Sequence, residues 1–260
     1  MGNPMRDVQS EPDDRNIPID KVGISDLSYP ISVLDRDNNT QPTVAKINMY
    51  VDLPHHYRGT HMSRFLEVMS RYHMGLSLRS LGELLEDIRE TFESETSHIE
   101  IEFPYFIKKK APVSGIESPM EYICRIEAKK RDKLELIVEV NVPAQNLCPC
   151  SKEISDYGAH NQRGNIKIRI RSSKLVWFEE LIAIAEESAS APVFTLLKRE
   201  DEKFLTEHAY DHPRFVEDTA REAAMRLNSD PRIEWYSVEV KNAESIHNHN
   251  AYACISKRVE

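Results

Sequence analysis

Two cysteines and a histidine lie close together near the middle of this 260-residue chain. Cys148 and Cys150 flank a proline, and His160 follows after a short polar stretch. Thiolate and imidazole groups are ligands that zinc and related divalent metals prefer. A metal ion held by such groups lowers the pKa of a bound water to about 7 and so supplies hydroxide at neutral pH. These residues therefore predict a metal site that could perform hydrolysis.

The spacing of these residues bears on the kind of metal site. A structural zinc site usually takes four ligands from two closely spaced Cys or His pairs. The chain has one such pair, which favours a catalytic metal with ligands from distant segments over a zinc finger. The alternative is that both thiols are small buried side chains, but the polar neighbours Asn146, Ser151 and Lys152 argue against it.

Further metal ligands could come from the segment 244–250, which carries His247 and His249 two residues apart. It lies between two predicted strands, so we expect a loop. Solvated loop histidines are common, and this segment alone would be weak evidence. Considered together with Cys148 and His160, it is a good candidate for supplying a ligand.

A run of charges at 198–203 offers three carboxylates, Glu200, Asp201 and Glu202. Such a run is usually a solvated face or loop. One of its carboxylates could complete a metal shell, but spacing alone does not choose among the three.

Glu217 follows a predicted helix start, where Asp211 can cap the helix and Pro213 suits its first turn. The helix dipole favours a carboxylate there, so Glu217 could be an ordinary helix-start acid. Alternatively, its carboxylate could accept hydrogen bonds from two adjacent N–H groups, such as those of a guanine or pterin edge.

A second predicted helix start, in segment 58–65, is positively charged through Arg58, His61 and Arg64. Helix N-termini bind anions, so this segment could hold a phosphate group. The alternative is a helix start capped by Thr60 or Ser63.

Alternating and helical apolar patterns predict the elements that must position these residues. Strands are expected at 46–53, 99–103, 122–128, 134–140, 166–170, 234–240 and 252–255. Helices are expected at 62–72, 78–92, 177–187 and 215–227. Each half of the chain thus reads as strands, two helices and strands again. This order predicts an α+β fold of antiparallel sheets with helices packed on one face.

The first residues, 1–25, are polar and irregular, and we expect a disordered arm there. The segments 26–130 and 131–260 would then form two modules, the second carrying most of the metal site.

Charge and composition exclude several kinds of partner. Lys and Arg number 34 against 43 Asp and Glu, a net charge of −9, which disfavours nucleic-acid binding. No apolar run approaches the roughly 20 residues that span a bilayer, so no membrane is expected. The N-terminus has no apolar segment of the kind found in signal peptides. With four cysteines and no export signal, we expect reduced thiols and a cytoplasmic protein.

Several motifs together resemble the prokaryotic GTP cyclohydrolases of type IB. They are Gly-Thr-His-Met-Ser-Arg-Phe (59–65), Cys-Pro-Cys-Ser-Lys-Glu (148–153), Gly-Ala-His-Asn-Gln-Arg-Gly (158–164), Phe-Val-Glu-Asp (215–218) and Glu-Ser-Ile-His-Asn-His (244–249). The resemblance runs from about residue 40 to the C-terminus, in consistent order and with no departure at a motif position.

The resemblance implies the tunnelling fold (T-fold), with two modules in each chain. It implies a homotetramer whose active sites lie at subunit interfaces. The family converts GTP and water into formate and 7,8-dihydroneopterin triphosphate, the first step of tetrahydrofolate biosynthesis.

The resemblance also assigns roles. The metal ligands would be Cys148, His160, Glu202 and His247, and the ion would be manganese, zinc or iron. Cys150 would donate or accept a proton close to the metal, and Glu217 would anchor the guanine. Candidates to bind the triphosphate are Arg58, His61, Arg64, Lys108 to Lys110, Lys152 and Arg163.

Two alternative functions remain at this point. A tunnelling-fold nitrile reductase would use Cys148 or Cys150 as a covalent nucleophile with NADPH. A non-catalytic purine- or metal-binding module would bind GTP or metal and release no formate.

Overall fold

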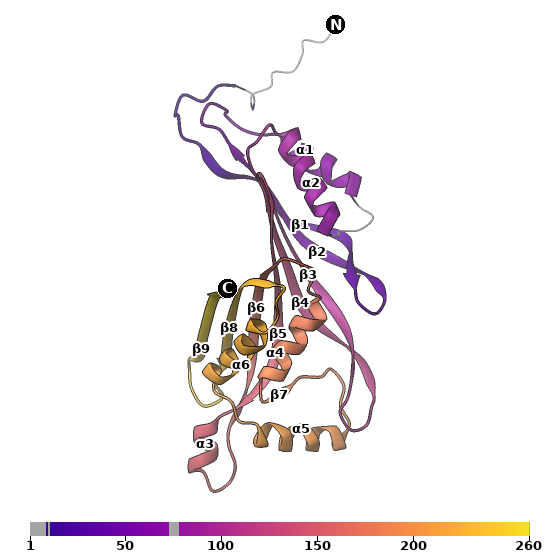
Figure 1. The fold of residues 1–260 in the computed structure, drawn as a ribbon, viewed down its shortest axis with the longest axis vertical. Helices are drawn as coiled ribbons and strands as arrows, with labels where there is room; N and C mark the ends of the chain where they lie inside the picture. Colours follow the sequence, from indigo (N-terminus) through magenta and orange to yellow (C-terminus); the bar gives the residue numbers. More distant parts are fainter. Residues whose placement is uncertain (1–8, 10, 73–77, 260) are drawn as a thin grey trace. The chain divides into compact units, whose positions relative to one another are not determined.

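The computed structural model describes residues 9, 11–72 and 78–259 (Figure 1). The elements before the Cys148 motif are β1 (Ile19–Asp35), β2 (Asn39–Leu53), α1 (Met62–Met69), a 3₁₀ turn η1 (Ser70–Tyr72), α2 (Leu78–Thr91), β3 (Ser97–Lys110), β4 (Glu117–Lys130) and β5 (Leu134–Leu147). Those after it are α3 (Pro149–Ile154), β6 (Asn161–Ser172), α4 (Phe178–Ser188), β7 (Ala191–Pro192), α5 (Arg199–Asp211), α6 (Val216–Asn228), β8 (Ile233–Ala243) and β9 (Asn250–Arg258). The predicted strands and helices are all present.

Hydrogen bonds link the strands in the order β1-β2-β3-β4-β5-β6-β8-β9, and β7 pairs with β5. The pairs β1–β2, β2–β3, β5–β6, β5–β7, β6–β8 and β8–β9 are antiparallel. Consecutive antiparallel strands need only short connections, and the helices are inserted between them. The predicted α+β architecture with antiparallel pairing is confirmed.

The chain forms two compact units, Met1–Phe103 with Arg125–Leu136, and Pro104–Cys124 with Ile137–Glu260. Strands β3, β4 and β5 contribute residues to both, so neither unit is one continuous stretch of chain. The simpler division into modules 26–130 and 131–260 stays a prediction.

The core of the first unit forms where α1 and α2 meet the sheet. The buried side chains alternate along β2 and β3, and they recur at helical spacing on both helices: Ile47, Met49, Val51, Ile99, Ile101, Phe65, Val68, Leu81, Leu84, Leu85 and Ile88. The rings of Phe65 and Phe92 stack with centroids 4.2 Å apart. This is the pattern from which the elements were predicted.

In the second unit, α4 and α6 cover the same face of the strands (Figure 1). That face is lined by Val140, Val142, Ile166, Ile168, Val238 and Val240, all fully buried. Three alanines, Ala220, Ala223 and Ala224, lie on the buried side of α6 and let it approach the sheet closely. The opposite face carries charged cross-strand pairs, such as Lys167 with Glu239 at 3.6 Å.

The predicted disordered arm, 1–25, is wrong at its end, because residues from Ile19 onward belong to β1. Register shifts break the pairing between Ile19 and Val22 and between Ile24 and Leu27, so no clean alternation marks this strand. Before it, Gln9 and Glu11 accept backbone hydrogen bonds from the segment around Gly59, both at 3.1 Å. Residues 1–8 and 10 lie outside the described residues.

Helix α5 was not predicted, because its first turn coincides with the charge run at 198–203. Only Leu205 and Ala209 mark its buried apolar side, and acids in the first turn suit a helix N-terminus. The Asp201 carboxylate accepts hydrogen bonds from Lys198 N, Val113 N and Ser114 N, each at 2.8 Å, and from Ser114 Oγ at 2.6 Å. Asp201 thereby caps α5 and attaches it to the β3–β4 turn.

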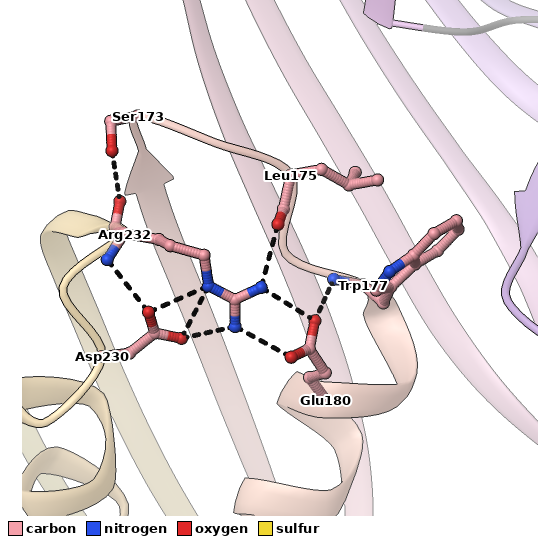
Figure 2. A network of polar contacts seen from close by, with 6 residues as sticks. All are labelled: Ser173, Leu175, Trp177, Glu180, Asp230 and Arg232. Carbon is pink, nitrogen blue, oxygen red and sulfur yellow. Dashed lines mark hydrogen bonds and ion pairs between the residues drawn. The ribbon is translucent and has the colours of Figure 1, made fainter.

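Arg232 joins the α6–β8 loop to the β6–α4 loop and to the first turn of α4 (Figure 2). Its guanidinium donates to Asp230 at 2.6 and 3.0 Å, to Glu180 at 2.8 Å and to the Leu175 carbonyl at 3.0 Å. The Glu180 carboxylate also accepts from Trp177 N at 2.8 Å, which closes the first turn of α4. Hydrogen bonds to Asp230 and Glu180 raise the pKa of Arg232 above its ordinary value.

Within the described residues, no helix is both long enough and apolar enough to cross a membrane.

We expect Arg232→Lys to lower the free energy of unfolding by about 1–3 kcal/mol, because lysine keeps the charge but cannot reproduce the planar fork. Urea unfolding measures the change. Arg131→Lys is the matched control, since the Arg131–Glu95 pair is 60% and 72% exposed and should contribute less than about 1 kcal/mol. Equal losses in the two variants would contradict this role for Arg232.

Asp201→Asn should lower the thermal midpoint at neutral pH. Burial opposes ionisation of Asp201, but hydrogen bonds from Ser114, Lys198 and Val113 outweigh it and hold the pKa below the ordinary 3.8. A lowered pKa stabilises the fold above about pH 4, and the contribution is lost as the pH falls toward the folded-state pKa. Thermal unfolding at several pH values should therefore show that the difference in thermal midpoint between Asp201→Asn and wild type becomes smaller below pH 4. Glu200→Gln, on an exposed side chain of the same turn, is the control.

Candidate active site

The chain folds back on itself so that the backbones of Cys148 and His160 meet. Cys148 follows the last residue of β5 and forms the N-cap of α3, and its Sγ accepts from Ser151 N at 3.5 Å. Cys148 N donates to the His160 carbonyl at 3.1 Å. His160 N in turn donates to Ser151 Oγ at 3.2 Å. Two of the predicted ligands are thus neighbours, held by backbone hydrogen bonds.

The surroundings of His160 favour one ring nitrogen for binding a ligand. Its Nδ1 lies 3.0 Å from Gln162 Oε1 and 3.4 Å from Ser245 Oγ. Donation from Nδ1 to the Gln162 oxygen leaves the lone pair on Nε2. Histidines that bind metals are oriented in this way by an acceptor on the other nitrogen.

The third predicted ligand, His247, lies in the loop between β8 and β9. Its side chain is exposed, and its ring stacks on His249 with centroids 5.0 Å apart. Ser245, two residues before His247, is the residue of this loop that reaches His160.

The structure distinguishes Asp201 from the two exposed acids, Glu200 and Glu202, at the start of α5. The Asp201 carboxylate is fully used by the helix cap and the β3–β4 turn. Glu202 is exposed, and it precedes Leu205 by three residues, so the two are neighbours on the helix surface. This favours Glu202 over Asp201 as a ligand.

A cavity of about 490 Å³ connects these segments. Its lining includes Leu205 of α5, Gln162 of β6 and Ser245 of the loop that carries His247. Arg163 contributes a positive charge, and Phe194 an aromatic wall. Neighbours of three predicted ligands, His160, Glu202 and His247, therefore border one cavity.

No group of three or more His, Cys, Asp or Glu side chains among the described residues is arranged to hold a metal ion. The four-ligand set of Cys148, His160, Glu202 and His247 therefore stays a prediction.

Cys150 is exposed, on the first turn of α3, and it is a free thiol. It is separated from Cys148 only by Pro149, so the two cysteines occupy different positions: Cys148 caps the helix and Cys150 lies within it.

Glu217 is exposed on the first turn of α6. The cap of this helix is made by Asp218, whose carboxylate accepts from Phe215 N at 3.0 Å. The role of helix-start acid therefore belongs to Asp218, and within the described residues Glu217 is free for another partner. Arg214 N donates to the Leu147 carbonyl at 3.0 Å, which ties the start of α6 to the residue before Cys148.

Some basic residues proposed for the triphosphate are already engaged. Lys109 is 13% exposed, pairs with Glu186 at 2.6 Å and donates to the Val193 carbonyl at 2.7 Å. Its burial lowers its pKa, which Glu186 opposes. Lys152 donates to the Tyr210 carbonyl and lies 4.1 Å from the centre of that ring.

Three others line cavities. Arg163 lines the cavity just described, and in the first unit Thr60, His61 and Arg64 line a separate cavity of about 170 Å³ at the start of α1.

A buried polar cluster behind these segments was not predicted. Asn146 and Asn242 are 0% and 1% exposed, on the face that carries Val140, Val142 and Ala144 of β5 and Val238 and Val240 of β8. The signal in the sequence was that, on each strand, the alternating row of apolar residues is followed two residues later by an asparagine.

Comparison with known proteins identifies the family of this chain. The family model described as type I GTP cyclohydrolase folE2 matches residues 5–253. GTP cyclohydrolase FolE2 of Pseudothermotoga lettingae is 60% identical over 257 residues, covering 98% of this chain and 100% of that protein. The FolE2 of Thermosipho melanesiensis is 57% identical over 256 residues, covering 98% and 99%.

Among solved structures, urate oxidase from Bacillus sp. TB-90 covers 93% of this chain and 100% of its own, with a TM-score of 0.55 at 9% identity. Uricase from Arthrobacter globiformis covers 93% of each chain, with a TM-score of 0.52 at 8% identity. Such low identity bears on the fold alone, and urate oxidases have the tunnelling fold with two modules in each chain. The chain has this fold, and it belongs to the type I GTP cyclohydrolase FolE2 family.

Proposed function

We propose that this chain opens the imidazole ring of GTP by metal-dependent hydrolysis, giving formate and 7,8-dihydroneopterin triphosphate. Membership of the FolE2 family supports the activity and its place as the first step of folate biosynthesis. The observation that carries the metal site is the meeting of Cys148 and His160, with His160 Nδ1 held by Gln162.

The donor set fits a divalent metal. A thiolate, two imidazoles and a carboxylate suit zinc, iron or manganese, and a mixed set of this kind does not select sharply among them. Cys148, His160, Glu202 and His247 would hold the ion, which when bound activates a water for attack at C8 of the purine. We propose that the set is completed in a homotetramer with active sites at subunit interfaces.

The remaining steps fall to side chains of the chain itself. Glu217 accepts hydrogen bonds from the guanine N1–H and N2–H₂ groups, which orients the purine so that C8 faces the reactive water. The thiol of Cys150 holds or releases a proton during ring opening, when N7 must be protonated, and during formate release.

The two alternative functions, nitrile reduction and non-catalytic binding, receive no support from the family match. We propose that the reaction takes place in the cytoplasm.

Cys148→Ala and Cys150→Ala form a matched pair. Cys148→Ala should lose both metal and formate release while remaining folded. Cys150→Ala should keep its metal and lose turnover by about 100-fold or more, as expected when a proton-transfer group is removed. Elemental analysis and a formate assay distinguish them, and full metal occupancy in Cys148→Ala would remove this residue from the shell.

Glu217→Gln should retain metal but lose GTP binding and turnover, because the amide presents a donor to a donor on guanine. Calorimetric titration with GTP tests this. The matched control is Asp218→Asn, which weakens the helix cap next to it and should lower thermal stability with little effect on GTP affinity. Wild-type affinity in Glu217→Gln would show that the purine is recognised elsewhere.

A further inference from the structure

A single buried amide connects the segments that carry the candidate site. Asn146 Nδ2 donates to Asn242 Oδ1 at 2.9 Å. Its Oδ1 accepts from Ser190 N and from Thr219 Oγ1, both at 3.3 Å. Asn146 is fully buried, as are Ser190 and Thr219. The amide therefore uses its donor and acceptor sides within the protein.

Each partner of Asn146 lies near a different functional residue. Asn146 itself is two residues before Cys148, and its cross-strand neighbour on β6 is Gln162, which holds His160. Thr219 is two residues after Glu217 on α6. Asn242 lies near the end of β8, just before the loop with His247.

The close packing of this cluster depends on a glycine. A Cβ at Gly164 would lie 2.5 Å from Asn242 Oδ1 and 3.1 Å from Asn146 Nδ2. The two asparagines thus occupy the space that the Cβ of any other residue at position 164 would fill, and Gly164 is the last residue of the Gly-Ala-His-Asn-Gln-Arg-Gly motif. Strand β6 is held against the same hydrogen-bonded pair.

Stability alone does not explain a polar cluster here. The positions of Asn146 and Asn242 continue apolar rows, and a buried amide costs free energy unless every hydrogen bond is made. An apolar pair would pack in many related arrangements, whereas directional hydrogen bonds select one.

We propose that Asn146 is a positioning residue that sets the Cys148 loop, the start of α6 and the end of β8 relative to one another. This rests on the proposed roles of Cys148, His160 and His247 in metal binding and of Glu217 in guanine binding. Through β5 and Asn242, the Asn146 amide positions the segments that carry the proposed metal ligands. Through Thr219, it acts on Glu217.

The contribution of Asn146 through Thr219 and its contribution through Asn242 can be tested separately. Thr219→Val keeps the shape of the side chain and removes its hydrogen bond to Asn146. We expect KM and the Kd for GTP to rise about 3- to 10-fold, with zinc affinity unchanged. Asn146→Leu/Asn242→Leu removes both side-chain amides together, so neither asparagine is left unpaired, although Ser190 N and Thr219 Oγ1 lose their acceptor. We expect its zinc affinity and kcat to fall about 10- to 100-fold, the usual effect of removing groups that orient ligands.

The measurements are zinc competition with a chromogenic chelator, GTP calorimetry, steady-state kinetics and thermal unfolding. Arg232→Lys is the control for general destabilisation, because Ile233 pairs with Ser172 at the opposite end of the β6–β8 ladder from the Gly164–Asn242 pair. It should lower stability while zinc and GTP affinities stay at wild-type values.

The proposal is overturned if both Asn146-cluster variants fold and bind zinc and GTP as wild type does. Failure of the proposed function has a different signature. In that case Cys148→Ala would keep its metal or Glu217→Gln would keep its GTP affinity, whatever the Asn146 variants do.

Discussion

Polar groups buried where strands end must find their hydrogen bonds inside the chain, and this constraint shapes the second unit. Strands β5 and β8 continue their apolar rows into Asn146 and Asn242, which water does not reach. The Asn146 amide donates to Asn242 Oδ1 and accepts from the neighbouring Ser190 N and Thr219 Oγ1. Since Leu147 N also donates to Ser190 Oγ at 3.0 Å, the backbone leading into Cys148 takes part in the same cluster. The place where β5 stops being a strand is thereby fixed, and so is the loop that follows.

Buried charges apply the same constraint to the walls of the cavity. The Lys109 ammonium is largely shielded from water. The loss of its hydration is compensated by an ion pair with Glu186, by a hydrogen bond to the Val193 carbonyl and by the face of the Phe194 ring, whose centre is 4.1 Å away. Tyr122 donates to the same Glu186 oxygen at 2.8 Å, so this carboxylate has two partners. Because Val193 and Phe194 line the cavity, a lysine that looked suited to a triphosphate instead supports the wall. A buried pair is costly to break and adds little when intact, so its effect is mainly on geometry.

The sequence predicted most of what depends on local pattern. Strands such as 166–170 and helices such as 78–92 follow from periodicity. The backbones of Cys148 and His160 do meet, but their expected joint role as metal ligands stays a prediction. What failed depends on contacts distant in the chain. Strand β1 is held by backbone pairing to β2 across two register shifts. Helix α5 is held by the hydrogen bonds that the Asp201 carboxylate accepts from the β3–β4 turn. The Asn146 cluster draws on four segments, and no local pattern encodes it.

Helices α5 and α6 use their acidic first turns in the same way. In α5, Asp201 accepts from Lys198 N, and in α6, Asp218 accepts from Phe215 N, so in each helix one carboxylate closes the cap. The adjacent acid, Glu202 or Glu217, is exposed and not needed for the cap. A carboxylate already engaged by backbone N–H groups has few lone pairs left for a ligand, whereas its neighbour keeps them while sharing the positive end of the helix dipole. The cap holds the backbone in place and the adjacent side chain stays available, which is the arrangement that a metal ligand on α5 and a guanine-binding acid on α6 both require.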